Sequence, residues 1–134
     1  MEGCNVTTLG VIICGSRNFY DYCELERVCD EVLLRLPNTI ITIIEGEASG
    51  ADKLGRQYAE SRGFKVEPHP ADWSRLGKKA GSVRNREMAQ SALEKYDKCM
   101  IIAFNLNNSR GTNDMVNVGM SNNIPVIVKR YRKE

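Results

Sequence analysis

Residues 9–17 read Leu-Gly-Val-Ile-Ile-Cys-Gly-Ser-Arg. Apolar residues run without a polar break from Leu9 to Cys14, and a glycine followed by two polar residues ends the run. An unbroken, β-branched run of this length is typical of a strand that is buried on both faces, as in a parallel sheet. A glycine at its end lets the chain turn sharply or approach a ligand closely. The sequence therefore predicts a buried first strand over Leu9–Cys14 that ends at Gly15.

The rest of the chain alternates between apolar runs and segments with helical periodicity. Four more strands are predicted over residues 39–44, 64–68, 98–104 and 125–128. Asp21 and Glu24 have the spacing of a capping box before a helix-period run that extends to Leu36. Three more helices are predicted over residues 51–63, 80–96 and 112–121. Strands and helices that alternate in this way predict an α/β, Rossmann-like three-layer fold, with a five-stranded, mainly parallel sheet in the order 3-2-1-4-5.

Length and composition are those of one globular domain spanning residues 1–134, with its core over about residues 9–128 and a basic, solvated tail at 129–134. The net charge of +2 is too small to suggest a nucleic-acid partner. No apolar run approaches the ~20 residues that span a bilayer, and the N-terminus lacks a signal-like pattern, so we expect a cytoplasmic protein without a membrane partner. No metal site or disulfide framework is expected, because Cys-x-x-Cys spacing is absent among Cys4, Cys14, Cys23, Cys29 and Cys99.

Positive charge is concentrated in residues 71–86, which contain five lysines and arginines and no acid between Asp72 and Glu87. The same stretch holds two glycines and Trp73, the only tryptophan, and it has neither strand nor helix character before about Ala80. A basic, glycine-containing loop that runs into a helix is suited to a phosphate, because guanidinium groups, backbone N–H groups and the helix dipole can converge there. The stretch therefore predicts an anionic small molecule as the ligand.

Polar or glycine-rich segments follow four of the predicted strands, at residues 15–18, 45–52, 71–86 and 105–112. The carboxyl ends of parallel strands meet at one edge of a sheet, and ligands bind there at the point where the strand order reverses. In the predicted order, the loops after the first and fourth strands flank this reversal. We therefore expect the four segments to form the walls of one pocket.

Four motifs in these segments resemble those of the YspA-like branch of the SLOG superfamily, a Rossmann-like fold named for SMF/DprA and LOG proteins. They are Gly15-Ser16-Arg17-x-Phe19, Gly46-x-Ala48-x-Gly50-Ala51-Asp52, the run with Asp72-Trp73, Gly77-Lys78, Ala80-Gly81 and Arg84-Asn85, and Ser109-x-Gly111-Thr112. The resemblance covers about residues 9–128. It implies a pocket for nucleotides, including compounds related to ADP-ribose or NAD. From the motifs we expect a sensor or a sequestering protein, of bacterial or phage origin.

Because proteins with these motifs commonly self-associate, we expect a homo-oligomer. We expect no required cofactor, with Mg²⁺ as an optional companion of the ligand's phosphates. Trp73 is suited either to stacking on a base or to covering the core, and Asp52 and Asp72 are alternative partners for ribose hydroxyls. The residues that we expect to contact the ligand are Gly15, Ser16, Arg17, Phe19, Gly46, Glu47, Ala48, Gly50, Asp52, Asp72, Trp73, Lys78, Arg84, Asn85, Asn105, Ser109, Gly111 and Thr112.

Binding is favoured over catalysis by the residue that follows Gly111-Thr112. LOG phosphoribohydrolases carry a glutamate three residues after this pair, whereas Met115 stands there in this chain. A thioether cannot act as a base or stabilise an oxocarbenium-like transition state. One alternative is a nucleotide N-glycosidase or phosphoribohydrolase that uses Glu45, Glu47, Asp52 or Asp114. Another is DprA-like binding of single-stranded DNA through Arg75–Arg86 and the basic tail.

Overall fold

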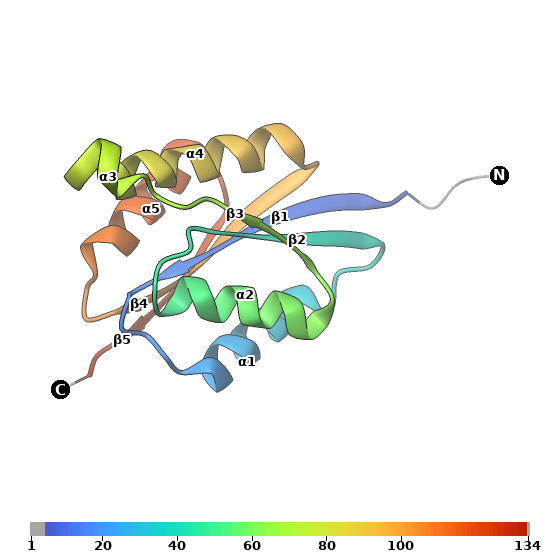
Figure 1. The fold of residues 1–134 in the computed structure, drawn as a ribbon. Helices are drawn as coiled ribbons and strands as arrows, with labels where there is room; N and C mark the ends of the chain where they lie inside the picture. Colours follow the sequence, from blue (N-terminus) through green and yellow to red (C-terminus); the bar gives the residue numbers. More distant parts are fainter. Residues whose placement is uncertain (1–4, 134) are drawn as a thin grey trace.

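The computed structural model describes residues 5–133 and contains one sheet of five parallel strands in the order β3-β2-β1-β4-β5 (Figure 1). This is the predicted order. The strands are β1 (Thr7–Gly15), β2 (Thr39–Glu45), β3 (Lys65–Pro68), β4 (Lys98–Leu106) and β5 (Val126–Tyr131). The strand order reverses between β1 and β4, so the crevice expected of such a sheet lies beyond the carboxyl ends of these two strands.

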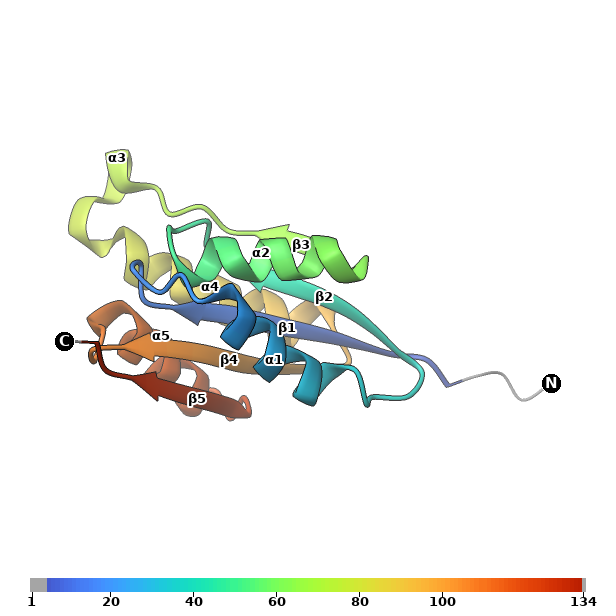
Figure 2. The same cartoon turned by 90° about the horizontal axis from the view of Figure 1, so that it is seen from below.

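Helices cover both faces of the sheet (Figures 1 and 2). One face carries α1 (Tyr22–Leu33) and α2 (Ala51–Arg62), and the other carries α4 (Ala80–Lys95) and α5 (Arg110–Ser121). Successive side chains of β1 alternate between the two cores: Val11 and Ile13 pack with α1 and α2, whereas Ile12 and Cys14 pack with α4 and α5. All four side chains are buried, which explains why the sequence of this strand shows no alternation with polar residues.

The helix boundaries agree with the predictions to within a few residues. Asp21 caps α1 by accepting a hydrogen bond of 3.1 Å from the backbone N–H of Glu24. Helix α1 ends at Leu33, three residues earlier than predicted, and Leu36 is exposed. The residue before a proline is disfavoured in a helix, and Pro37 directly follows Leu36, so the helical periodicity there is not used.

Two segments differ from the sequence prediction. Residues 73–79 form a short helix α3 (Trp73–Leu76) and a 3₁₀ turn (Gly77–Lys79), where a loop was predicted. The second is the C-terminal segment, where β5 continues to Tyr131 and takes in part of the expected tail. Strand β4 extends to Leu106, which pairs with Tyr131 and so provides a strand partner for the end of β5. The Tyr131 hydroxyl also donates a hydrogen bond to Glu24. Charged residues on such an edge strand discourage pairing with other chains.

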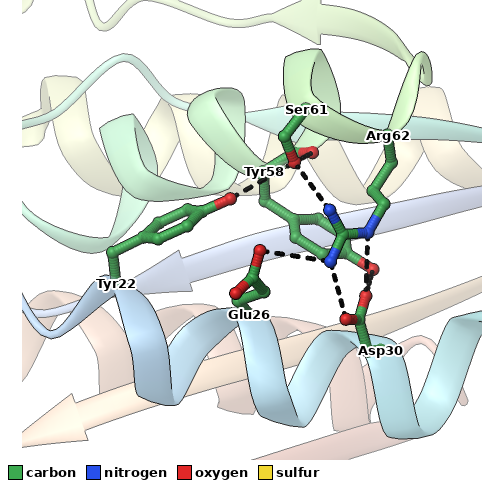
Figure 3. Close-up of polar contacts among 6 residues, drawn as sticks. All are labelled: Tyr22, Glu26, Asp30, Tyr58, Ser61 and Arg62. Atoms are coloured by element: carbon green, nitrogen blue, oxygen red, sulfur yellow. Dashed lines mark hydrogen bonds and ion pairs between the residues drawn. The ribbon is translucent and has the colours of Figure 1, made fainter.

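A polar network joins α1 to α2 on the face away from α4 (Figure 3). Arg62 on α2 donates two hydrogen bonds to Asp30 on α1, of 3.1 and 2.7 Å, and one to Glu26. The hydroxyl of Tyr58, whose residue is fully buried, donates to Asp30 over 2.7 Å. The Arg62 hydrogen bonds lower the pKa of Asp30, which therefore stays ionised and accepts from both partners.

None of the helices within residues 5–133 combines the length and the apolar character that crossing a bilayer requires.

Replacing Tyr58 by phenylalanine tests the contribution of this network to stability. The substitution keeps the ring but removes a buried donor to a carboxylate, so we expect the free energy of unfolding to fall by about 1–2 kcal/mol in urea titrations. Tyr20→Phe is the matched control, because Tyr20 is 67% exposed. Equal stability of the Tyr58→Phe variant and the parent would contradict the assignment.

Candidate functional site

A cleft lies at the carboxyl end of the sheet, where the strand order reverses. Its larger part, which we call the larger chamber, has a volume of about 830 Å³ and is lined by the loops after β1, β2 and β4 and by α3, α4 and the start of α5. A smaller chamber of about 290 Å³ adjoins it, between residues 46–49 and 70–73. The two chambers share Arg17, Ala48, Ser49, Trp73 and Arg84 as walls.

Ser16 holds the loops around the cleft together. Its backbone N–H donates to the carbonyl of Phe104, and its carbonyl accepts from the N–H of Ala51 at the start of α2. Its hydroxyl donates to the carbonyl of Leu106 over 3.1 Å and accepts from the N–H of Leu106 over 2.8 Å. The hydroxyl is therefore engaged with β4, and Ser16, which also lines the larger chamber, positions the loops of the cleft.

Two glycines allow the loops after β1 and β2 to approach each other. Gly50 has a φ of 74°, and a Cβ atom there would collide with the carbonyl groups of Ser16 and Arg17. A Cβ atom on Gly15 would lie 2.6 Å from that of Ala51 and would also collide with the carbonyl of Phe104. Gly50 does not line either chamber. Its predicted contact with the ligand is therefore corrected to a contact with the neighbouring loop.

Four cationic side chains line the larger chamber: Arg17, Lys78, Arg84 and Arg110. Among residues 5–133, none of the four forms an ion pair with a carboxylate, whereas Arg27, Arg56, Arg62 and Arg75, which lie outside the cleft, all do. The acids that line the larger chamber are Asp52 and Asp114. Positive charge thus exceeds negative charge in the cleft, as a site for an anion requires.

Two hydrogen bonds fix the orientation of the buried Arg84 side chain. Its Nη1 donates to the carbonyl of Gly46 over 2.6 Å, and its Nε donates to Oδ1 of Asn85 over 3.0 Å. Its Nη2 forms no hydrogen bond within the described part of the chain and lies 3.8 Å from the position that a Cβ atom on Gly81 would occupy. Because a buried guanidinium needs partners, the free Nη2 at the wall of the cleft is a donor available to a ligand.

Arg17 and Trp73 meet across the cleft. The guanidinium carbon of Arg17 lies 5.1 Å from the centroid of the Trp73 ring, within the range of a cation–π interaction. The Arg17 side chain has no hydrogen-bond acceptor within residues 5–133, so its N–H groups remain available. Trp73 is 47% exposed, although α3 places it against the cleft. A tryptophan that is half exposed in a cleft is suited to stacking on a flat group, whereas a core tryptophan would be covered.

Two buried carboxylates hold the loop after β2. Asp52 accepts from the N–H groups of Gly46 and Ala48 over 3.1 and 3.3 Å, and Glu45 accepts from that of Glu47 over 2.6 Å. Burial raises the pKa of Asp52 to about 6 and that of Glu45 to about 7. Among residues 5–133, the second oxygen of Glu45 has no hydrogen-bond partner and lies 3.9 Å from Nη1 of Arg56. Glu45, one of the candidate carboxylates of the hydrolase alternative, lines neither chamber, and its hydrogen bond to Glu47 shapes the loop.

The wall formed by α4 and α5 carries the remaining carboxylate of the larger chamber. Asp114 accepts from the Asn85 amide over 2.9 Å and from the Ser82 hydroxyl over 3.5 Å. Met115, at the position of the LOG glutamate, is buried and also lines the chamber. Helix α5 is capped by Ser109, whose hydroxyl oxygen accepts from both the N–H and the hydroxyl of Thr112. The start of α5 thus faces the cleft with its Arg110 and Gly111.

The structure brings most of the predicted contact residues together. Those that line the larger chamber are Gly15, Ser16, Arg17, Ala48, Asp52, Trp73, Lys78, Arg84, Asn85, Ser109, Gly111 and Thr112, together with the candidate acid Asp114. Gly46 and Glu47 line the smaller chamber. The basic residues Lys79 and Arg86 line neither of them.

Three predicted contact residues line neither chamber, and their side chains are engaged elsewhere. Phe19 is buried in the α1–α2 core, where its ring stacks on that of Phe104. Asp72 caps α3 and forms an ion pair with Arg75. Asn105 lies outside the cleft and orients the start of α5, with its Oδ1 accepting from the N–H of Ser109. A strand-end position alone does not tell which way a side chain turns, and this is why the sequence misplaced them.

Sequence reasoning missed other residues of the cleft, among them Asn18, Tyr20, Ser82, Asn107 and Arg110. Arg110 had a signal, because it lies inside the Ser-Arg-Gly-Thr segment. Among the described residues, no three His, Cys, Asp or Glu side chains are gathered as a metal site would require. Cys14, Cys23, Cys29 and Cys99 are thiols, and Cys4 lies outside the described residues.

Comparisons with known proteins agree with the motifs. The sequence profile of the YspA, cpYpsA-related SLOG family (YAcAr) matches residues 10–76. The chain is also similar to the Gene 61 protein of Mycobacterium phage D29, with 36% identity over 122 residues, which cover 87% of this chain and 93% of the phage protein. The profile match contains the loops after β1 and β2 and extends to α3, and thus includes Arg17 and Trp73.

The buried Glu45 predicts an unusual dependence of stability on pH. Because its pKa is raised from 4.5 to about 7, the folded protein retains a proton that the unfolded chain releases, and stability is lost as the pH rises through this window. Asp52 acts in the same sense from 3.8 to about 6. We expect the melting temperature of the parent to fall more steeply between pH 5 and 7 than that of Glu45→Gln.

Glu60→Gln is the control for this experiment, because Glu60 lies on the same side of the sheet but its side chain is 69% exposed. Its melting temperature should follow that of the parent across the window. Parallel curves for the parent and Glu45→Gln would refute the assignment.

Proposed function

Because the chain belongs to the YspA, cpYpsA-related SLOG family, we propose that the cleft binds a small molecule derived from a nucleotide. The observation that carries this proposal is the set of four cations in the larger chamber that have no carboxylate partner within residues 5–133. Charged groups left without partners around a cleft are suited to a ligand of opposite charge, and guanidinium groups match phosphate oxygens in geometry. Trp73 adds a surface on which a base can stack.

The ligand that we propose is ADP-ribose, an NAD-related compound or another signalling nucleotide, and the protein acts as its sensor or sequesters it. Met115 at the position of the LOG glutamate supports binding without turnover. The volume of the larger chamber falls within the range of about 300–1,000 Å³ found for small-molecule sites. Self-association, a cytoplasmic location and participation of Mg²⁺ stay predictions from the sequence.

Calorimetric titration with AMP, ADP, ADP-ribose and NAD tests binding directly. Arg17→Ala removes a free guanidinium at the junction of the chambers. We therefore expect it to lower the affinity for the nucleotide about tenfold or more, as the loss of one charge-assisted contact does. Lys79→Ala removes one positive charge at a position that lines neither chamber and should leave the affinity within about twofold. Absence of binding by the parent at millimolar nucleotide would refute the proposal.

Hydrolysis is a second candidate, and one observation favours it. Asp114 lies one position before Met115, yet its carboxylate lines the larger chamber and is held by Asn85 and Ser82. A carboxylate in this place can act as a base or stabilise a positive charge on a sugar. Catalysis would then use a residue next to the one that LOG enzymes use.

Chromatography of a nucleotide panel after prolonged incubation separates the two candidates. A hydrolase would release base or phosphate from a bound nucleotide, and Asp114→Asn would lower the rate by at least about a hundredfold, the usual contribution of a general acid or base. Under the binding proposal, the recovered nucleotide is intact although calorimetry shows that it binds.

A further inference from the structure

Arg17 and Trp73 divide the cleft into two chambers that differ in charge. The smaller chamber has one charged residue of its own, Glu47, and otherwise shares Arg17 and Arg84 with its neighbour. The larger chamber adds two cations, Lys78 and Arg110, and two acids, Asp52 and Asp114. Both acids accept hydrogen bonds from neutral donors, namely backbone N–H groups for Asp52 and the Asn85 and Ser82 side chains for Asp114. Among residues 5–133, cations without a carboxylate partner therefore border the junction and the larger chamber, whereas the smaller chamber adds none of its own.

The smaller chamber suits an uncharged group that carries hydroxyls. Its walls are the backbone and small side chains of residues 46–49 on one side, and Pro70, Ala71 and the Trp73 ring on the other. Its volume of about 290 Å³ is just below the range of about 300–1,000 Å³ found for whole ligand sites, as suits a chamber that holds only part of a ligand. A phosphate placed wholly within this chamber would lie near the carboxylate of Glu47, whereas sugar hydroxyls can donate to it. One oxygen of this carboxylate pairs with Arg56 over 3.4 Å, which leaves the other oxygen to accept from a sugar hydroxyl.

The junction suits a phosphate. Within residues 5–133, the Arg17 side chain donates to no acceptor and lies over the Trp73 ring, and the Nη2 of Arg84 likewise donates to none. Because both arginines border both chambers, a phosphate between them can join a group in one chamber to a group in the other. Lys78 and Arg110 then remain for a second phosphate in the larger chamber.

From this distribution we infer that the ligand contains a nucleoside diphosphate, with its nucleoside in the smaller chamber, its first phosphate between Arg17 and Arg84, and its second phosphate near Lys78 and Arg110. Any group attached to the second phosphate lies in the larger chamber. The inference rests on the proposed function but goes further, because a mononucleotide would leave Lys78 and Arg110 without a role. Binding of this ligand is non-covalent.

Calorimetry with AMP and ADP, which differ by one phosphate, tests the inference. We expect the parent to bind ADP at least about tenfold more tightly than AMP, the gain expected from one charge-assisted contact. Lys78→Ala and Arg110→Ala should reduce this preference, and the double variant should bring the ratio of affinities close to one. Ala71→Trp, which fills the smaller chamber, should lower the affinities for both AMP and ADP by about tenfold or more and leave the ratio of the two affinities unchanged.

Gln57→Trp controls for the added bulk, because Gln57 is exposed on α2 and lines neither chamber. Thermal melting verifies that each variant is folded. Equal affinity of the parent for AMP and ADP would contradict the inference that the ligand contains a diphosphate. An unchanged ratio of these two affinities in the double variant would contradict it as well. Full affinity of a folded Ala71→Trp variant would overturn the placement of the nucleoside. Failure of the parent to bind any nucleotide would instead refute the proposed function itself, and is recognised before any variant is measured.

Discussion

The geometry of the cleft depends on the hydrogen bonds of Ser16. This one residue connects β1 to Phe104 and Leu106 of β4 and to the first residue of α2, through its backbone and its hydroxyl. Loops from different strands are otherwise free to move, and each such connection lowers the entropy that a bound ligand would have to remove. Ser16 therefore positions Arg17, the next residue, against Trp73, and the missing side chains of Gly15 and Gly50 make the close approach possible.

Charge is distributed unevenly around this frame. Arginines on α1 and α2 are neutralised by carboxylates in the network of Figure 3 and by neighbours along their helices. In the cleft, Asp52 is turned toward backbone N–H groups and Asp114 toward an amide and a hydroxyl. The acids near the cleft thus stabilise loops and walls instead of pairing with the cations, which leaves a positive field for an anion. Burial of Glu45 without a full set of hydrogen-bond partners lowers the stability of the fold. The same carboxylate holds the loop after β2, which forms part of the cleft.

The pocket and the fold differ in how far they can be predicted. The strand order follows from the alternation of strands with helices, and the cleft follows from the rule that ligands bind where the order reverses. Individual side chains are harder, because a change of one position turns a residue to the other face of a strand. Phe19 follows the glycine turn like its polar neighbours, yet its ring packs on Phe104 because apolar area was available there. Asp72 was predicted to bind ribose hydroxyls, but it caps α3. This helix has only four residues and is too short to show a helical period in the sequence.

By itself, the sequence determined the class of fold, the sheet order, the helix cap at Asp21 and the four segments that meet at the cleft. These features depend on local patterning, on the period of buried residues and on general rules of parallel sheets, all of which can be read along the chain. Tertiary structure alone decided which cations lack partners, how Arg17 and Trp73 divide the cleft, and which side chains turn into the core. These properties depend on contacts between residues far apart in the chain, such as Arg84 with Gly46 and Asn85 with Asp114, and no pattern within one segment encodes them.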